Sequence, residues 1–181
     1  NELNLWTGAA GEGSFDGFST LLATDADLPT AQEVAGIAIT ATNVVAEMGK
    51  VVDAIPSSLY GRDDLHIYVA QNVFRAYKRA LGIAGYVDKF NNQDINIQYI
   101  DGVKIFMANG LASDTMVATT KDNLWFGTGL ASDSQLVKLL DMENLDGSQN
   151  VRVIMRFTAG VQYGVVEDIV TYGIPNAANP A

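Results

Sequence analysis

The side chains that most often perform catalysis or bind metals are scarce in this sequence. His66 is the only histidine among 181 residues, and the chain has no cysteine. A Ser-His-Asp triad needs a histidine with defined partners, and a zinc site of the usual kind needs several nitrogen or sulfur ligands. No such pattern accompanies His66, and the acidic residues form no recognisable catalytic pair. We expect His66 to be a packed or surface residue, and we predict no enzyme, no catalytic residue, no cofactor and no metal site.

Two short patterns resemble ligand-binding loops but lack a decisive residue. Asp141, Asn144 and Asp146 carry oxygen ligands that suit calcium, yet the glutamate that closes an EF-hand loop is absent. The glycine-rich residues 7–13 resemble a phosphate-binding loop but have no Lys-Ser/Thr ending and no preceding strand. We interpret the first pattern as a polar turn and the second as a linker.

Composition argues against several functional classes. The formal net charge is −10, from 21 acidic and 11 basic residues, which disfavours binding of nucleic acid by neutralisation of its phosphates. Arg75, Lys78 and Arg79 lie close together, and we expect them on the solvated side of a short helix. No apolar run reaches the roughly 20 residues that span a bilayer. With 48% hydrophobic residues, the chain is expected to fold as one large domain or two small lobes.

The elements that position these residues are organised around one predicted long helix, residues 30–55. Its apolar residues recur at steps of three and four and form a stripe: Val34, Ile37, Ala41, Val44, Met48, Val51 and Ile55. Thr30 and Glu33 fit a capping box at its start, and Pro56 ends it because the residue before a proline avoids helical geometry. We expect this helix to be the spine of a domain, and a coiled-coil dimer is the alternative.

The rest of the chain predicts strands and one short helix. The helix is expected over residues 73–81, with Asn72 as its N-cap and Gly82 after its end. Asp101-Gly102 between two alternating segments is a strong hairpin signal. The expected strands cover residues 65–69, 95–100, 103–107, 115–119, 124–128, 136–142, 151–157 and 161–172. This order predicts an α+β fold in which the helices are segregated from an antiparallel sheet.

Five segments in this order resemble the major capsid protein of tailed bacteriophages of the Hong Kong 97 type. The long helix corresponds to the spine of that family's peripheral domain. The other segments are a strand that leads into a short helix, a glycine-led strand, a strand that ends in a Phe-Gly-Thr-Gly turn, and a closing pair of strands. They cover residues 65–74, 101–105, 116–129, 150–157 and 161–172. The resemblance extends over residues 15–173 and rests on order more than on invariant residues.

The resemblance implies a chain of two lobes. Residues 1–63 and 150–174 would form a discontinuous peripheral-type domain around the spine helix, residues 64–149 an axial-type lobe, and residues 175–181 a frayed tail. The family's amino-terminal arm and most of its extended loop are absent, and the chain begins without methionine, so we expect a fragment or a processed product. The lysine and asparagine that cross-link some members map onto no residue of this chain.

The resemblance implies a structural shell protein. Copies would assemble as hexamers and pentamers into the icosahedral head of a phage virion, built in the bacterial cytoplasm, which encloses packaged DNA without binding it specifically. It implies no membrane and no small-molecule substrate. An encapsulin-like compartment shell is the alternative with the same fold. A cell-surface or carbohydrate-binding β-module is the alternative of another class, and exposed Trp6 and Trp125 would suit it.

The last strands allow a direct structural test. Residues 151–157 and 161–172 flank the tight turn Ala159-Gly160. The capsid hypothesis predicts that they form an antiparallel hairpin, which packs against the apolar stripe of the long helix. A β-module would pair this hairpin only with strands nearby in the sequence, such as residues 136–142.

Overall fold

The computed structural model describes residues 2–10, 15–85, 97–129, 137–143, 147, 149–155 and 158–178. The chain forms two compact units. Residues Asn1–Trp125 and Val161–Ala181 belong to the first unit, and residues Phe126–Gly160 to the second. The first unit is therefore discontinuous in sequence. The division into a peripheral-type domain and an axial-type lobe stays a prediction.

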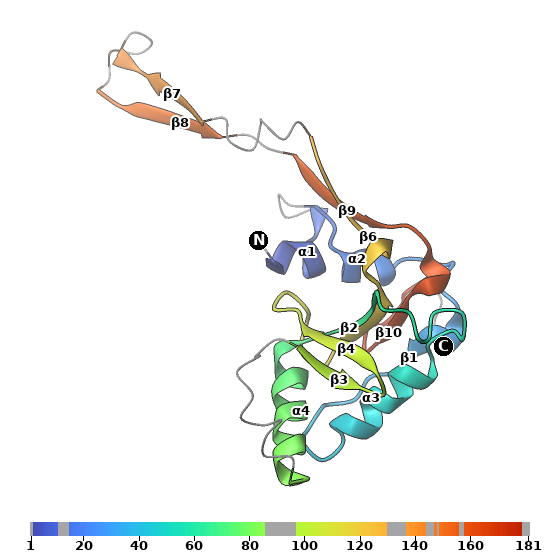
Figure 1. Cartoon of the computed structure of the whole chain (residues 1–181). Helices are drawn as coiled ribbons and strands as arrows, with labels where there is room; N and C mark the ends of the chain where they lie inside the picture. The colour runs from blue at the N-terminus through green and yellow to red at the C-terminus, as the bar shows by residue number, and fades with distance from the viewer. Residues whose placement is uncertain are drawn as a thin grey trace. The chain divides into compact units, whose positions relative to one another are not determined.

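A six-stranded mixed sheet forms the centre of the first unit (Figure 1). Its strands lie in the order β1, β10, β5, β2, β4 and β3, with the bounds Glu33–Val34, Val170–Tyr172, Met116–Thr120, Leu65–Val69, Val103–Met107 and Ile97–Ile100. The pairs β1–β10 and β2–β4 are parallel, and the other pairs of this sheet are antiparallel. The predicted α+β class is confirmed, with a mixed sheet in place of the expected antiparallel one.

Helices cover both faces of this sheet. Figure 1 shows α1 and α2 on one side and α3 and α4 on the other. Their bounds are Glu2–Thr7, Phe18–Leu22, Val44–Asp53 and Gln71–Ile83. Trp6 of α1 packs against Tyr68 of β2, with ring centroids 5.3 Å apart. Among the helices described, none combines the length and the hydropathy needed to cross a bilayer.

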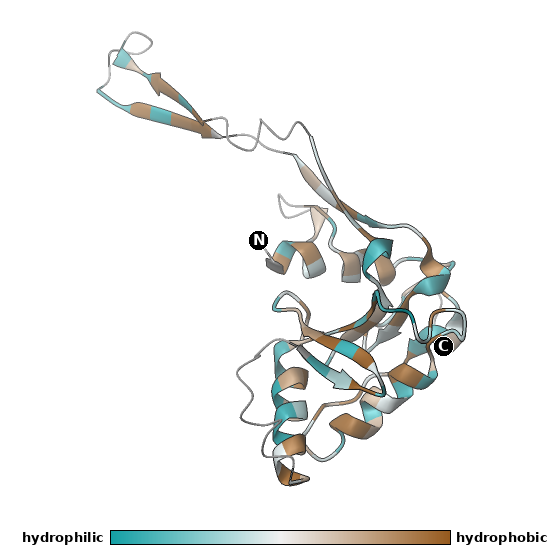
Figure 2. Ribbon diagram, in the orientation of Figure 1, coloured by the Kyte–Doolittle hydropathy of each residue, from teal (hydrophilic) through white to brown (hydrophobic). Residues whose placement is uncertain are grey.

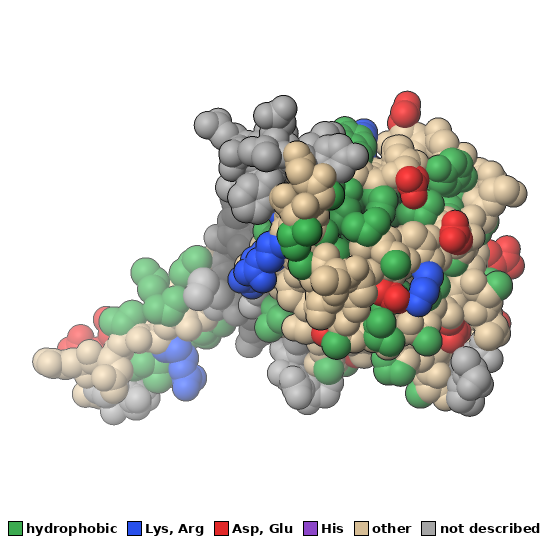
Figure 3. Space-filling view, turned by 90° about the horizontal axis from the view of Figure 1, so that it is seen from below, with side chains coloured by type: hydrophobic (Ala, Val, Ile, Leu, Met, Phe, Trp, Pro, Cys, Tyr) green, Lys and Arg blue, Asp and Glu red, His purple; other side chains and the backbone are tan. Residues whose placement is uncertain are grey.

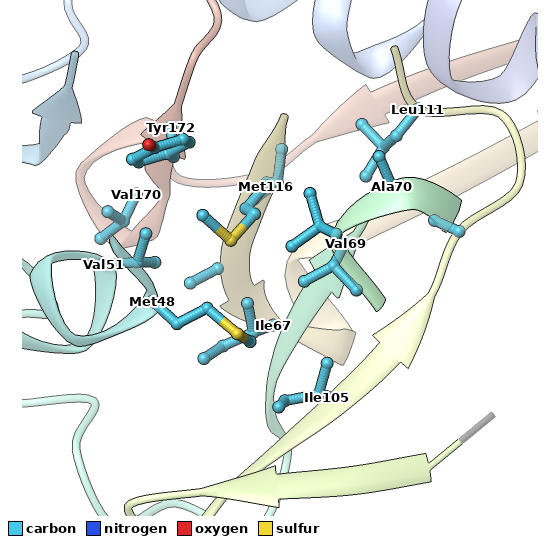
Figure 4. Close-up of a cluster of buried hydrophobic side chains, with 14 of the residues drawn as sticks. Met48, Val51, Ile67, Val69, Ala70, Ile105, Leu111, Met116, Val170 and Tyr172 are labelled. Carbon is cyan, nitrogen blue, oxygen red and sulfur yellow. The ribbon is translucent and has the colours of Figure 1, made fainter. Parts of the chain in front are cut away.

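The hydrophobic core of the first unit includes the contact between α3 and the sheet (Figure 4). Met48 and Val51 of α3 lie close to Ile67 of β2 and Met116 of β5, and all four residues are fully buried. Burial of a side chain of this size contributes about 1.5–3 kcal/mol relative to leaving it exposed. Packing of this kind holds a helix of only ten residues in place.

The predicted turn at Asp101-Gly102 is confirmed. Both residues have positive φ angles, 46° and 83°, as a type I′ turn between two antiparallel strands requires. Ile100 and Val103 lie opposite each other at the end of the β3–β4 ladder next to this turn. Residues 95 and 96 of the predicted strand lie outside the described residues, and the described strand begins at Ile97.

The predicted helix over residues 30–55 is wrong for its first part. Helix α3 begins at Val44, while Glu33–Val34 form the edge strand β1. Thr30 opens a single 3-10 turn with Pro29 at the N-cap position, so Thr30 does not cap a long helix. The capping box at Thr30 and Glu33 therefore does not form, and the apolar stripe is helical only from Val44 onward.

Tertiary hydrogen bonds explain this difference. The Tyr172 hydroxyl oxygen accepts a hydrogen bond from the backbone N–H of Ile37 at 3.1 Å. The Asp114 carboxylate accepts one from the backbone N–H of Ile39 at 3.0 Å. Helix propensity is a weak preference that tertiary contacts override. The segment between β1 and α3 is therefore held against the sheet as a loop that ends in a turn at residues 41–43.

Helix α4 is longer than predicted, and Asn72 does not cap it. The helix begins at Gln71, with Ala70 at the N-cap position. The Asn72 side-chain amide instead donates to the Asp114 carboxylate at 2.7 Å and accepts from the Asp114 backbone N–H at 3.1 Å. Asp114 has a positive φ of 63°, and this reciprocal pair holds it in that conformation. Asn72 thus ties α4 to the loop before β5.

The closing hairpin predicted for residues 151–172 is wrong. Strand β8 pairs antiparallel with β7, β9 pairs with β6, and β10 joins the six-stranded sheet. The bounds of β6 to β9 are Leu124–Thr128, Val137–Asp141, Val151–Met155 and Ala159–Tyr163. The predicted contact with the helix is confirmed for β10, which packs against α3. Tyr172 of β10 donates its hydroxyl hydrogen to Glu47 of α3 at 2.8 Å.

The C-terminal segment is anchored at Asn176. This residue is buried, and its side-chain amide donates to the backbone oxygen of Asp25 at 2.7 Å and to the Glu33 carboxylate at 3.0 Å. The sequence predicts a frayed tail over residues 175–181, whereas Asn176 is fixed by these bonds. Residues 179–181 lie outside the described residues.

Candidate assembly surface

The structure places His66 among packed aromatic side chains. The residue is buried, its Nδ1 lies 2.7 Å from the carbonyl oxygen of Asp64, and its ring packs edge-on against Phe106. Burial lowers the pKa of His66, which favours the neutral ring at pH 7. This is the packing role that the sequence predicts for an isolated histidine.

The two loop-like sequence patterns do not form a site in the described residues. Asp141 accepts a hydrogen bond from the backbone N–H of Glu143 at 3.0 Å, while Asn144 and Asp146 lie outside the described residues. Residues 11–13 of the glycine-rich segment also lie outside them. In the described part of the chain, no group of three or more His, Asp or Glu side chains could hold a metal ion.

The two tryptophans differ in exposure. Trp6 has only 5% of its surface exposed and packs against Phe18, whereas Trp125 is 60% exposed. A ring that stacks on a ligand must present an accessible face. Trp6 therefore cannot form part of a carbohydrate platform, and the expectation that it is exposed is wrong.

The second unit contains a two-stranded ribbon, β7–β8, whose faces differ in chemistry. Leu139 of β7 lies opposite Val153 of β8 in an antiparallel ladder. Because side chains alternate between the faces of a strand, one face carries four residues that we call the apolar ladder: Val137, Leu139, Val151 and Val153. Asp141, opposite Val151, ends this face. The other face mixes basic and apolar residues: Lys138, Leu140, Arg152 and Ile154.

The apolar ladder is exposed. Leu139 has 68% of its surface exposed, and the three valines have between 53% and 64%. Figure 2 shows that hydrophobic residues dominate both strands, and Figure 3 shows hydrophobic side chains gathered along one side of the ribbon, with basic and further hydrophobic side chains on the other. Exposed apolar residues that lie side by side mark an interaction surface, unlike single apolar residues scattered over a protein.

The ribbon also has open strand edges. Among the described residues, β7 and β8 pair only with each other. A two-stranded hairpin is marginally stable in water by itself, and an unpaired edge offers backbone N–H and C=O groups to another strand. The ribbon is therefore suited to a protein partner that covers the apolar ladder or extends the sheet. We take it as the candidate assembly surface.

Sequence reasoning finds both strands of this surface but not their pairing. Apolar residues predict strands over residues 136–142 and 151–157, and they alternate with other residues in the second of these. The turn Ala159-Gly160 gives a competing local signal, which assigns the second of these strands to a different partner. The exposure of the ladder is not predicted, because an alternating strand of a buried sheet has the same pattern.

Comparison with known proteins identifies the fold. No family model and no curated protein matches the chain. One similar solved structure is described as Mycobacterium phage Che8, with a TM-score of 0.53 and 14% sequence identity. Another is described as the satellite phage P4 procapsid including size determination (Sid) protein, with a TM-score of 0.52 and 12% identity. The similarity covers 84% and 88% of this chain, and 57% and 50% of those chains.

The chain thus spans about half the length of the structures that it matches. At this sequence identity the similarity concerns the fold alone. The protein shares its fold with a chain of the satellite phage P4 procapsid structure and with a chain of the structure described as Mycobacterium phage Che8.

Proposed function

We propose that this protein is a structural subunit of a bacteriophage head. Copies associate through the apolar ladder of the β7–β8 ribbon and build a closed shell. The observation that supports this proposal most strongly is an exposed apolar ladder in a chain whose fold resembles that of a phage procapsid structure. Such a protein acts by contact between copies, so its function needs no catalytic residue.

The more specific proposal is a major capsid protein with a Hong Kong 97-like fold. The order of elements supports it, because β2 leads into α4 and the glycine-led strand β4 follows. The peripheral-type domain and the axial-type lobe belong to the same proposal. The long spine helix does not support it, because α3 begins only at Val44.

The proposed partners are other copies of this chain, in hexamers and pentamers of an icosahedral virion. Packaged DNA would be enclosed without specific binding. The net charge of −10 supports this, because an acidic surface repels phosphates. Contacts between acidic copies offer few oppositely charged pairs, whereas burial of apolar surface needs none. We therefore expect association between copies to rest on burial of apolar surface.

Imaging of the assembled product tests the proposal. The protein is expressed in bacteria, and particles are examined by negative-stain electron microscopy and by sedimentation velocity across a concentration series. Closed shells, or rings that are parts of them, are the expected result. Shells that enclose a folded enzyme in place of DNA would support the encapsulin alternative. A strictly monomeric protein at every concentration would contradict self-assembly.

A matched pair of variants connects assembly to the ribbon. Leu139→Lys combined with Val153→Lys places two charges on the apolar ladder and should abolish association. Ile83→Lys is the control, because Ile83 is an exposed apolar residue of the first unit, at the end of α4. If the ribbon variant associates like the wild type, the apolar ladder is not the assembly surface.

A further inference from the structure

Residues 33–43 combine a helical sequence pattern with a backbone that is strand at residues 33 and 34, irregular over residues 35–40 and a turn over residues 41–43. Val34, Ile37 and Ala41 continue the apolar stripe of α3 at steps of three and four, yet β1 pairs with β10 and α3 begins at Val44. We infer that this segment has two states. In the first state, which the structure shows and which we call the clasp, β1 pairs with β10 and the backbone of Ile37 and Ile39 is bound by Tyr172 and Asp114. In the second state these contacts are lost and the segment becomes an amino-terminal extension of α3. This inference does not depend on the proposed function.

Lengthening an existing helix is easier than forming a new one. The first turn of a helix carries the nucleation penalty, and each further residue adds a hydrogen bond. Helix α3 already supplies that turn and is fixed to the sheet by its buried residues. In the clasp, 52% of the surface of Ile37 is exposed. In the extended helix, Ile37 would lie on the same face as Val44 and Met48.

The hydrogen bonds that hold the clasp use donors that a helix also satisfies. The backbone N–H of Ile37 donates to the Tyr172 hydroxyl at 3.1 Å, and that of Ile39 donates to the Asp114 carboxylate at 3.0 Å. In an α-helix each N–H would donate to the carbonyl four residues earlier, which for Ile37 is that of Glu33. The exchange of states therefore leaves neither N–H without an acceptor.

The clasp leaves buried polar atoms unsatisfied at the point where it joins the sheet. The Gln32 side chain donates to the backbone oxygen of Glu167 at 2.6 Å, but its Oε1 is buried without a partner among the described residues. The hydroxyl of Thr171, in the register position opposite Glu33, is likewise buried without one. Buried polar atoms without partners destabilise the state that contains them. Two of them at one junction favour release.

Gly36 is the residue that most clearly separates the two states. A Cβ atom at this position would lie 2.4 Å from the Cα of Gly173, so the clasp excludes every side chain there. In a helix the preference is reversed, because glycine is less favourable than alanine. Release of the clasp would also uncover the edge of β10, and an open edge can accept another strand.

Circular dichroism and NMR of the full chain test the inference with Gly36→Ala. This variant should raise the helical signal at 222 nm by about a third, because residues 33–43 would join helices of 6, 5, 10 and 13 residues. The Cα chemical shifts of the segment should become helical. The control is Gly49→Ala within α3, where an added Cβ meets nothing within 4 Å. It should change the signal by less than about a tenth.

Two results of this experiment would overturn the inference. One is a folded Gly36→Ala variant with the wild-type helical signal and wild-type chemical shifts over residues 33–43. The other is loss of structure in the segment without helical shifts. If Gly36→Ala does not fold, Tyr172→Phe decides, because it removes the hydroxyl that holds Ile37 but keeps the ring. Helical shifts at Ile37 and Ile39 in that variant support the two-state segment, and unchanged shifts refute it.

Discussion

Glu47 is a carboxylate in the interior of the first unit that links α3 to β10. It accepts hydrogen bonds from Lys50 Nζ at 2.8 and 3.0 Å and from the Tyr172 hydroxyl at 2.8 Å. The hydrogen bond from Lys50 holds the pKa of Glu47 below its usual value of 4.5, although burial acts in the opposite direction. Glu47 is therefore ionised at neutral pH, and its charge contributes to stability.

This arrangement predicts a specific acid sensitivity. Because the pKa of Glu47 is lower in the folded chain than in the unfolded chain, its contribution is fully present above about pH 4.5 and is lost as the pH falls through the folded-state pKa. Denaturant midpoints of the wild type and Glu47→Gln, measured from pH 7 downward, should converge as the pH falls. A constant difference between the two curves would show that this carboxylate does not contribute to the acid dependence.

Gly102 tests backbone conformation without any change in packing. Its φ is 83°, and an added Cβ would meet nothing within 4 Å. Gly102→Ala should therefore destabilise the protein by about 1 kcal/mol through left-handed strain alone. Gly49→Ala lies within a helix, where alanine is more favourable than glycine, and should therefore stabilise the protein. Equal effects of the two substitutions on the denaturant midpoint would be inconsistent with the turn described here.

At the scale of the element, α3 depends on packing more than on its own propensity. An isolated helix of ten residues is unstable in water, so its buried face must hold it. Met48→Ala should cost about 2–5 kcal/mol, because it leaves a cavity between the helix and the sheet. Val45→Ala, on the exposed face, should cost less than about 0.5 kcal/mol. Chemical denaturation measures the free energy of unfolding of both variants. Similar losses in the two would contradict the assignment of Met48 to the buried face and Val45 to the exposed face.

The same element shows where sequence reasoning succeeds and fails. The stripe from Val44 to Val51 predicts the buried face of α3 because period and packing agree there. The part of the stripe before Val44 fails because Tyr172 and Asp114, distant in sequence, bind the backbone of residues 37 and 39. No local pattern contains that information. The turn at residues 101 and 102 succeeds because its geometry is determined by two adjacent residues.

The candidate assembly surface follows the same division between local and distant information. Local apolar patterns predict β7 and β8 as strands, since each pattern lies within a few residues. Their pairing and the exposure of Leu139 depend on which segments the sheet of the first unit accepts. That sheet takes β10 between β1 and β5, and β8 remains with β7. The sequence pattern therefore predicts which segments form strands, but it does not determine which strands pair with each other.

At the scale of the whole molecule, the net charge of −10 opposes association of copies. Salt screens this repulsion, since the Debye length falls to about 10 Å at 0.1 M, while burial of the apolar ladder is not weakened by it. Self-association should therefore strengthen as sodium chloride is added, which sedimentation velocity at low and high salt measures. Weaker association at high salt would indicate that oppositely charged contacts dominate, against the surface proposed here.

The position of β10 has a consequence for synthesis of the protein. Strand β10 lies between β1 and β5, but Val170–Tyr172 leave the ribosome after every other strand of the sheet. Until then β5 has an open edge and β1 has no strand to pair with. A chain released early by the ribosome would keep that edge exposed, and exposed edges promote aggregation. Closing the sheet therefore requires synthesis of the chain through Tyr172, and a chain that stops earlier keeps an edge open to other strands.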